Sequence, residues 1–152
     1  MRNMKRSKGF TLVELLVVVA AIGILSALVL SSMTRMNTAT QTKRITDDIG
    51  IIVAQAGAYR GASSIYTGVS ITELVTLGLV NPDWGDGTTA NPAGGDYTVA
   101  VDSTNANRVI VTATALEDDV CANVIRKFVD VADVAPTCTG TSGAQVATVA
   151  FR

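Results

Sequence analysis

The stretch GFTLVELLVV, residues 9–18, decides the fold because it opens a long apolar run that holds a single acid, Glu14. Twenty consecutive uncharged residues separate Glu14 from Arg35, about the length that a helix needs to cross the hydrocarbon core of a bilayer. The run therefore predicts a membrane-spanning helix. An ionised carboxylate at bilayer depth costs about 2.5 kcal/mol or more, so another interaction must offset the cost of Glu14.

The residues before this run predict its orientation. Arg2, Lys5, Arg6 and Lys8 precede it with no acid among them, which predicts a cytoplasmic N-terminus and a translocated remainder. A secretory signal peptide has a similar layout, but its apolar part is shorter and it ends in a cleavage region. Here a helix-compatible sequence follows instead. A plain single-pass anchor also fits, although it leaves Glu14 unexplained.

The rest of the chain is acidic and lacks the side chains of most catalytic sites. After residue 9, eight basic residues face thirteen acidic ones, and the sequence has no histidine. The excess of acid argues against a nucleic-acid partner, and two cysteines are too few for a four-thiolate zinc site. No nucleophile, base and orienting group can be assembled from the sequence. It therefore predicts no enzyme, no cofactor and no metal site.

A polar stretch follows the apolar run, and its apolar residues recur on one helical face. They are Ile45, Ile49, Ile52 and Ala56. One helix from Phe10 to about Tyr59, roughly 75 Å long, is therefore expected to pack its second half on a globular head. Gly23 and Gly50 are candidate points of bending or local melting, or of close helix packing.

From about residue 59 the chain alternates turn-rich and apolar segments, which predicts a small head of mixed structure. A short helix is expected over 70–77, because Ser70 and Glu73 form a capping box; a second is expected after Glu117. Strands are expected at 97–101, 108–114 and 145–151, with loop over 81–96. The fold class is therefore α+β: a long N-terminal helix, transmembrane in its first half and amphipathic in its second, packed on a small antiparallel sheet.

The segment KGFTLVELLVVVAAIGIL, residues 8–25, resembles the processing and assembly signature of type IV pilins and of the pseudopilins of type II secretion. The resemblance implies that a prepilin peptidase cuts between Gly9 and Phe10 and then methylates Phe10. Glu14 corresponds to the family's assembly glutamate, fifth in the mature chain. The implied parts are a leader at 1–9, a helix at 10–58 and a head at 59–152; residues 10–34 would form the membrane or fibre-core half of the helix, and 35–58 would pack on the head.

Cleavage after Gly9 would provide Glu14 with a partner. It would free an α-amino group on Phe10, whose reference pKa is near 8, so that the group is mostly cationic. Glu14 lies four residues further on, roughly 6 Å along a helix axis. The carboxylate could pair with the amine of its own chain or of a neighbour. The resemblance favours the neighbour, whose amine would fix the register of helices in a filament.

The two cysteines are expected to form a disulfide. Under the predicted topology, Cys121 and Cys138 reach a compartment in which disulfides form and persist, which favours a bond over two free thiols. The bond would close a loop of about seventeen residues and tie the late helix to the loop before the final strand. In the resembling family this disulfide bounds a surface-exposed D-region, here about residues 122–137.

Two further groups of side chains suggest binding sites that we do not expect. The acids Asp83, Asp86 and Asp96 lie among turn glycines but lack the spacing of a calcium loop, so a solvated loop is expected. The aromatic residues Tyr66, Trp84 and Tyr97 could form an adhesive patch, but at least partial burial is expected in a small head.

The resemblance implies a structural subunit of a type IV pilus that polymerises through its N-terminal helix for adhesion, twitching motility or a related surface function. The implied partners are the prepilin peptidase, the assembly machinery of the bacterial inner membrane and further copies of the chain. The precursor would lie in that membrane with its head outside, and the pilus would be extracellular. The segment YTGVSITELVTLGLVNPDW, residues 66–84, the GG turn after it and the late cysteine pair resemble the heads of type IVb pilins. The nine-residue leader and Phe10 are more similar to those of type IVa. A pseudopilin, a minor pilin and a membrane-tethered binding protein remain as alternatives.

Overall fold

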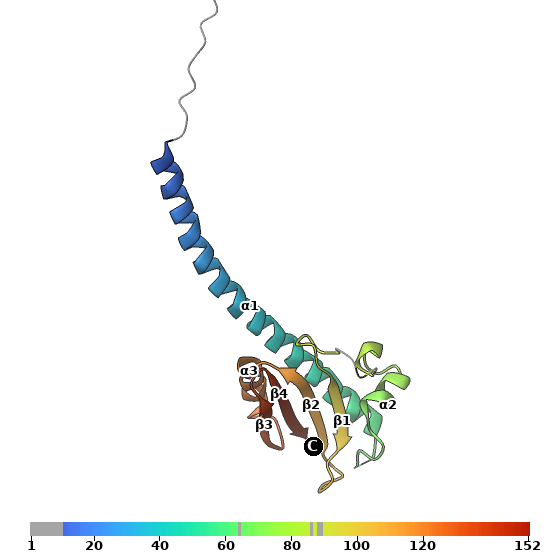
Figure 1. The fold of residues 1–152 in the computed structure, drawn as a ribbon. Coiled ribbons are helices and arrows are strands. Elements are labelled where there is room, and N and C mark those ends of the chain that lie inside the picture. The colour runs from blue at the N-terminus through green and yellow to red at the C-terminus, as the bar shows by residue number, and fades with distance from the viewer. Residues whose placement is uncertain (1–10, 64, 86, 88–89) are drawn as a thin grey trace, which may run out of the picture. The chain divides into compact units, whose positions relative to one another are not determined.

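The computed structural model describes residues 11–152, apart from Ser64, Asp86, Thr88 and Thr89 and the side chains of residues 27–35. Figure 1 shows the order of its helices and strands. The chain forms two compact units, Met1–Asn37 and Thr38–Arg152. The long helix α1, Leu12–Arg60, runs through both. We call Thr38–Arg152 the head unit; it holds the sheet and the hydrophobic core.

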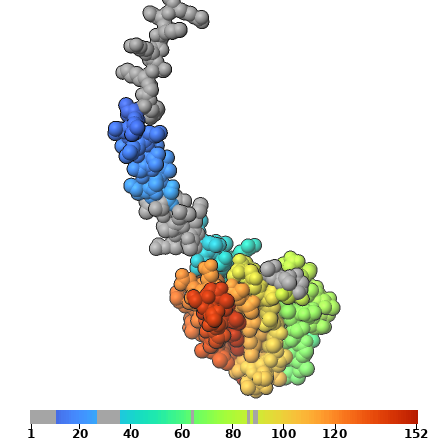
Figure 2. All heavy atoms as spheres, viewed as in Figure 1, coloured from blue at the N-terminus to red at the C-terminus, as the bar shows by residue number. Residues whose placement is uncertain are grey.

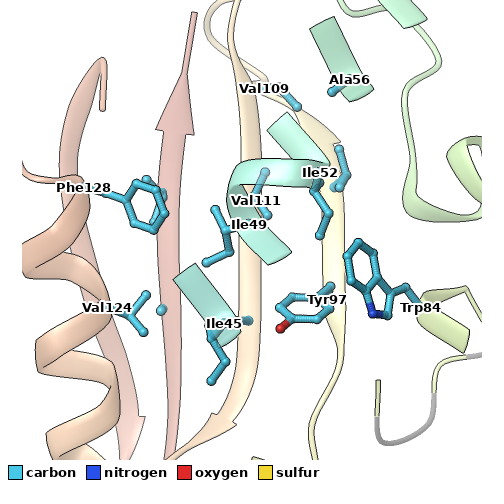
Figure 3. Close-up of a cluster of buried hydrophobic side chains, with 14 of the residues drawn as sticks. Ile45, Ile49, Ile52, Ala56, Trp84, Tyr97, Val109, Val111, Val124 and Phe128 are labelled. Carbon is cyan, nitrogen blue, oxygen red and sulfur yellow. The ribbon is translucent and has the colours of Figure 1, made fainter. Parts of the chain in front are cut away.

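Helix α1 confirms the single long helix expected from the sequence, and it continues through Gly23 and Gly50. Its expected apolar face is also confirmed, because four of its residues have no exposed surface. They are Ile45, Ile49, Ile52 and Ala56. Figure 3 shows these side chains among those of Tyr97, Val109 and Val111 from the sheet. Full burial of a side chain of this size contributes roughly 1.5–3 kcal/mol, so this face fastens α1 to the sheet.

The sheet has four antiparallel strands in the order β1-β2-β4-β3. Their bounds are Tyr97–Val101 for β1, Val109–Leu116 for β2, Val134–Thr141 for β3 and Ala144–Phe151 for β4. The register aligns Val99 with Val111 and Val111 with Val149, which places three buried side chains in one row across the sheet. The α+β fold class and the three expected strands are therefore confirmed.

Strand β3 is the element that the sequence analysis missed, since residues 122–137 and the segment after them were expected to precede the final strand as helix and loop. In the structure β3 pairs with β4 along the edge of the sheet, and a register shift separates Val134 from Thr137. Pro136 lies within this irregularity, where a strand tolerates a residue without an N–H group. Ser142 and Gly143 join the paired residues Thr141 and Ala144 in a tight hairpin, and Gly143 adopts the positive φ of 78° that such turns favour.

The short helix α2, Ile71–Thr76, and its caps agree with the sequence. The side chain of Ser70 accepts a hydrogen bond from the Glu73 backbone N–H at 3.1 Å, and Gly78, just past the helix, has a φ of 67°. Residues 81–96 contain one turn of 3-10 helix, Pro82–Trp84, where only loop was expected. Here Asn81 caps the turn by accepting from the N–H of Asp83.

The expected burial of the three aromatic residues is confirmed, and it is nearly complete. Tyr66, Trp84 and Tyr97 expose 2%, 8% and 1% of their surfaces. The rings of Trp84 and Tyr97 meet edge to face with centroids 5.3 Å apart, and the Tyr97 hydroxyl donates to Asp48 on α1 at 2.7 Å. These side chains form core, so they cannot form an adhesive patch on the surface.

An ion-pair network at Arg108 joins three segments of the head unit. The guanidinium donates to Asp102, just after β1, at 2.8 Å and to Asp133, just before β3, at 2.7 Å. Asp102 also accepts from the hydroxyl and the backbone N–H of Thr104, both at 2.7 Å. The bonds from Thr104, followed by that from Arg108, lower the pKa of Asp102 to about 2.

We expect the head unit to lose the stability that this network provides when the pH is lowered. The folded pKa of Asp102 lies below its unfolded value of about 3.9, so the stabilisation is present above about pH 4 and is lost as the pH falls through 2. An Asp102→Asn variant should therefore unfold at lower urea than the wild type at pH 6, and the difference should shrink by pH 2. Fluorescence of Trp84, the single tryptophan, measures this. Asp130 is exposed, so Asp130→Asn serves as the control. If the difference in stability between Asp102→Asn and the wild type is the same at every pH, the proposed pH dependence of the Arg108 network is wrong.

Candidate functional site

The first unit presents a helix whose apolar side chains lie on all sides. Every described side chain from Thr11 to Ser26 is exposed, and Figure 2 shows this segment in blue as a rod of uncovered atoms. The large apolar residues among them are Leu12, Val13, Leu15, Leu16, Val17, Val18, Val19, Ile22, Ile24 and Leu25. A helix that is apolar all round is normally buried in lipid or protein. Among the residues that the structure describes, no helix combines the length and the hydropathy that crossing a membrane requires.

Glu14 is the one charged side chain in this described apolar stretch, and it lies at the start of α1. Its Oε2 atom accepts hydrogen bonds from the backbone N–H and from the hydroxyl of Thr11, both at 2.9 Å. The Glu14 N–H donates in return to the Thr11 hydroxyl at 3.3 Å. The carboxylate therefore stabilises the first turn of the helix, where free N–H groups favour negative charge.

Thr11 is the functional residue that the sequence analysis missed. Thr11 and Glu14 are three residues apart, the spacing of a capping box, in which the hydroxyl and the carboxylate each bond the backbone N–H of the other residue. This signal is present in the sequence as TLVE. It shows that Glu14 has a local role in starting the helix, besides any role in pairing with a cation.

The predicted processing residues lie outside the described part of the chain. Gly9 and Phe10, between which the cut is expected, precede the first described residue, Thr11. Phe10 is nevertheless bonded to Thr11, whose N–H contacts the Glu14 carboxylate. Cleavage and methylation at Phe10 therefore remain predictions from the sequence.

The expected disulfide between Cys121 and Cys138 is confirmed, with the two Cα atoms 6.1 Å apart. Cys121 is fully buried on α3, Asp118–Phe128, and Cys138 lies on β3. The expectation that the bond reaches a loop is wrong, since it joins α3 to the edge strand of the sheet. Cys138 lies on a strand that the sequence analysis missed, because the irregular pairing between Val134 and Thr137 interrupts the pattern of a strand.

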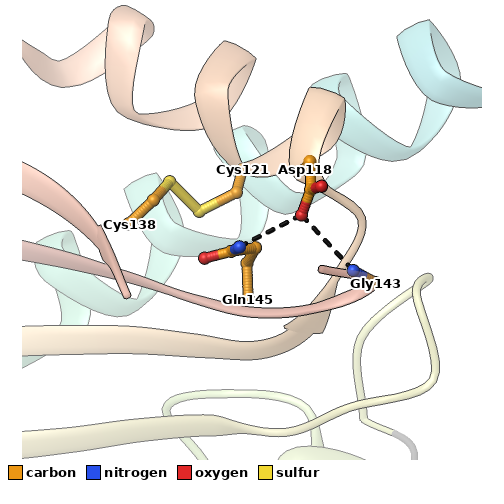
Figure 4. Close-up of a disulfide and its surroundings, with 5 residues drawn as sticks. All are labelled: Asp118, Cys121, Cys138, Gly143 and Gln145. Carbon is orange, nitrogen blue, oxygen red and sulfur yellow. Dashed lines mark hydrogen bonds between the residues drawn. A yellow bond between two sulfur atoms is a disulfide. The ribbon is translucent and has the colours of Figure 1, made fainter. Parts of the chain in front are cut away.

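A polar contact beside the disulfide joins the same two parts of the fold (Figure 4). The Asp118 carboxylate at the start of α3 accepts from the Ser142 hydroxyl at 2.6 Å, the Gln145 amide at 3.0 Å and the Gly143 N–H at 3.3 Å. These bonds lower the pKa of Asp118. Together, the disulfide and Asp118 hold α3 to the β3–β4 hairpin.

The acidic loop does not assemble a metal site in the described part of the chain. No group of three His, Cys, Asp or Glu residues that could hold a metal occurs among the described residues. Asp86, one of the three loop acids singled out in the sequence, lies outside them.

Comparison with known proteins agrees with the N-terminal site and the fold. Residues 4–30 match the family model described as the prokaryotic N-terminal methylation motif. Together with the α+β fold and the disulfide, this match confirms the chain's resemblance to type IV pilins.

One relative shows how far the similarity extends along the chain. The type IV major alpha-pilin of Moraxella bovis is 32% identical over 82 residues, which are 53% of this chain and 52% of that protein. The chain therefore spans about half the length of the curated relative that it matches. No solved structure matches it significantly.

Proposed function

We propose that this chain is the precursor of a type IV pilin, a structural subunit that polymerises into a filament. The observation that supports this best is the first turn of α1, where the Glu14 carboxylate accepts a hydrogen bond from the Thr11 N–H. The peptide bond expected to be cut joins Gly9 to Phe10, the residue directly before Thr11. The proposed cut therefore creates a positively charged amine on Phe10, close to the negative carboxylate of Glu14.

The same turn explains how the Glu14 carboxylate can be stabilised both in the membrane precursor and in the filament. In the precursor, Glu14 is held by Thr11, which partly compensates its charge while the helix is in the membrane. In the filament, the methylated amine of a neighbouring Phe10 would pair with it. A helix displaced along the filament axis would leave both charges unpaired, and loss of one partner of a buried pair typically costs about 3–5 kcal/mol.

The exposed apolar surface of α1 supplies the driving force for both states. Residues 11–26 would contact acyl chains in the inner-membrane precursor, with the N-terminus cytoplasmic, and other helices in the filament core. The acidic head unit would remain in water, where net charge favours solubility. In this proposal the protein's work is mechanical and structural, with the prepilin peptidase and the assembly machinery as its partners and no catalysis of its own.

The proposal is tested by shearing filaments from cells that express the chain with and without a prepilin peptidase. We expect abundant fibres composed mainly of this chain only when the peptidase is present. A chain that stays in the membrane fraction of peptidase-positive cells, with no sheared fibres, would contradict a pilin role.

The relative's description as a major pilin favours an abundant subunit over the alternatives. A minor pilin or a pseudopilin would share the N-terminus but would be scarce in sheared fibres at native expression. A membrane-tethered binding protein would keep the basic leader of residues 1–9 in its mature form.

A further inference from the structure

The head unit carries a basic cleft between α1 and α3 that the proposed N-terminal contact does not use. The cleft encloses about 750 Å³ and is lined on the α1 side by Thr42, Lys43 and Asp47 and on the α3 side by Arg126 and Lys127, among others. Lys43 pairs with Asp47. Arg126 and Lys127 are exposed and have no ion-pair partner among the described residues.

This cluster of positive charge is unusual for its surroundings. The head unit has twelve acidic and seven basic residues, and three of those seven line this one cleft. The hydroxyl of Thr42 is buried and has no hydrogen-bond partner in the described part of the chain. The cleft therefore offers a hydroxyl donor and two unpaired cations, a combination suited to carboxylates.

The opposite end of the same helix carries the complementary charge. A hollow of about 370 Å³ at the start of α3 is lined by Glu117, Asp118 and Asp119 together with the β3–β4 turn. Asp118 accepts hydrogen bonds from Ser142 and Gly143 of that turn. Glu117 and Asp119 are exposed and form no ion pair or side-chain hydrogen bond with any described residue.

We propose that these two ends of α3 form a contact between successive copies of the chain, in which Arg126 and Lys127 of one subunit meet Glu117 and Asp119 of the next. The inference rests on the proposed filament. Within one chain the two ends cannot meet, because ten residues of helix separate Glu117 from Lys127 by roughly 15 Å. Two different patches that complement each other make a head-to-tail contact, and such a contact builds an open filament when its rotation does not close into a ring.

The contact selects the orientation of each added subunit. A copy added in reverse would place acid against acid or base against base, and like charges in contact disfavour the wrong arrangement. The Glu14 pair would set the position of helices in the core, whereas the α3 contact would set the rotation of one head against the next.

Zero-length carbodiimide coupling of full-length wild-type filaments tests the contact without mutation. The reagent joins a carboxylate to a lysine amine only when the two touch, so we expect a Lys127–Glu117 or Lys127–Asp119 peptide in sheared filaments. The same peptide should be missing from detergent-solubilised monomers. Its absence from filaments, or its equal presence in monomers, would overturn the proposal.

Charge reversal provides the second arm. We expect reversal of either charged pair to reduce the yield of sheared filaments about tenfold, because attraction becomes repulsion at two positions. The two double variants are Arg126→Glu with Lys127→Glu, and Glu117→Lys with Asp119→Lys. All four substitutions together should restore the yield. Equal disulfide formation and membrane content of each variant show that its head is folded.

The outcomes separate this inference from the proposed function. If wild-type chains form fibres and both reversed pairs form them equally well, the α3 contact is wrong while the pilin role stands. If only the Arg126→Glu, Lys127→Glu pair reduces filaments and the combination of all four substitutions does not restore them, the basic cleft binds an acidic group other than Glu117 and Asp119. The proposed α3 contact is then also wrong. If the wild type forms no fibres, both proposals fail.

Discussion

Replacing Glu14 by alanine is expected to leave the chain in the membrane fraction, with its disulfide formed, but to reduce sheared filaments by at least about a hundredfold. The reason is that every subunit of a filament would then bury an unpaired amine, at roughly 3–5 kcal/mol each. The measurement is immunoblotting of sheared and cell-bound fractions. Normal yield of filaments would show that the charge pair is dispensable.

A second substitution separates the two roles of Glu14. Glutamine keeps an oxygen that can accept from the Thr11 N–H, as in a capping box, but it carries no charge. Glu14→Gln should therefore assemble almost as poorly as Glu14→Ala. Thr11→Ala removes the hydroxyl and methyl group but keeps the backbone N–H that donates to Glu14, so it should assemble nearly normally. If glutamine restores filaments, the first turn of α1 requires the cap and not the charge.

Loss of the disulfide is expected to be the largest single change in the stability of the head unit. The Cys121–Cys138 bond spans 17 residues, and closing a loop of this length in the unfolded chain is worth about 3 kcal/mol. A variant with alanine at both positions should unfold at correspondingly lower urea, followed by Trp84 fluorescence of the full-length chain in detergent.

The matched control for this prediction is the native protein treated with reductant. Reduction keeps both sulfur atoms in place, with Cys121 fully buried and Cys138 partly buried, so it removes the bond without creating a cavity. Reduced wild type and the double variant should lose similar stability. If reduction changes nothing, the bond adds no constraint beyond what Asp118 and the β3–β4 turn already provide.

Elements with a strong local pattern could be predicted from the sequence. The spacing of Ile45, Ile49, Ile52 and Ala56 indicated the buried face of α1, and the alternation in residues 97–101 and 109–113 indicated β1 and β2. Each pattern reports burial on one side of a regular element. Strand β3 has no such pattern, because Pro136 interrupts its pairing and most of its side chains are exposed at the sheet edge.

Contacts between distant segments could not be predicted in the same way. The Arg108 network joins residues 102 and 133, and the basic cleft joins Lys43 to Arg126; only the fold brings either set together. Thr11 differs, since its capping spacing was visible in the sequence. The carboxylate that is costly in a bilayer also accepts the hydrogen bonds that begin α1.

The mass of the N-terminal peptide from purified filaments tests the central claim most directly. If the chain is cut after Gly9 to free the partner of Glu14, the peptide should begin at Phe10 and carry one additional methyl group. Filaments whose subunits retain residues 1–9 would have no free amine beside Thr11, and the account of Glu14 as half of an intersubunit charge pair would be contradicted.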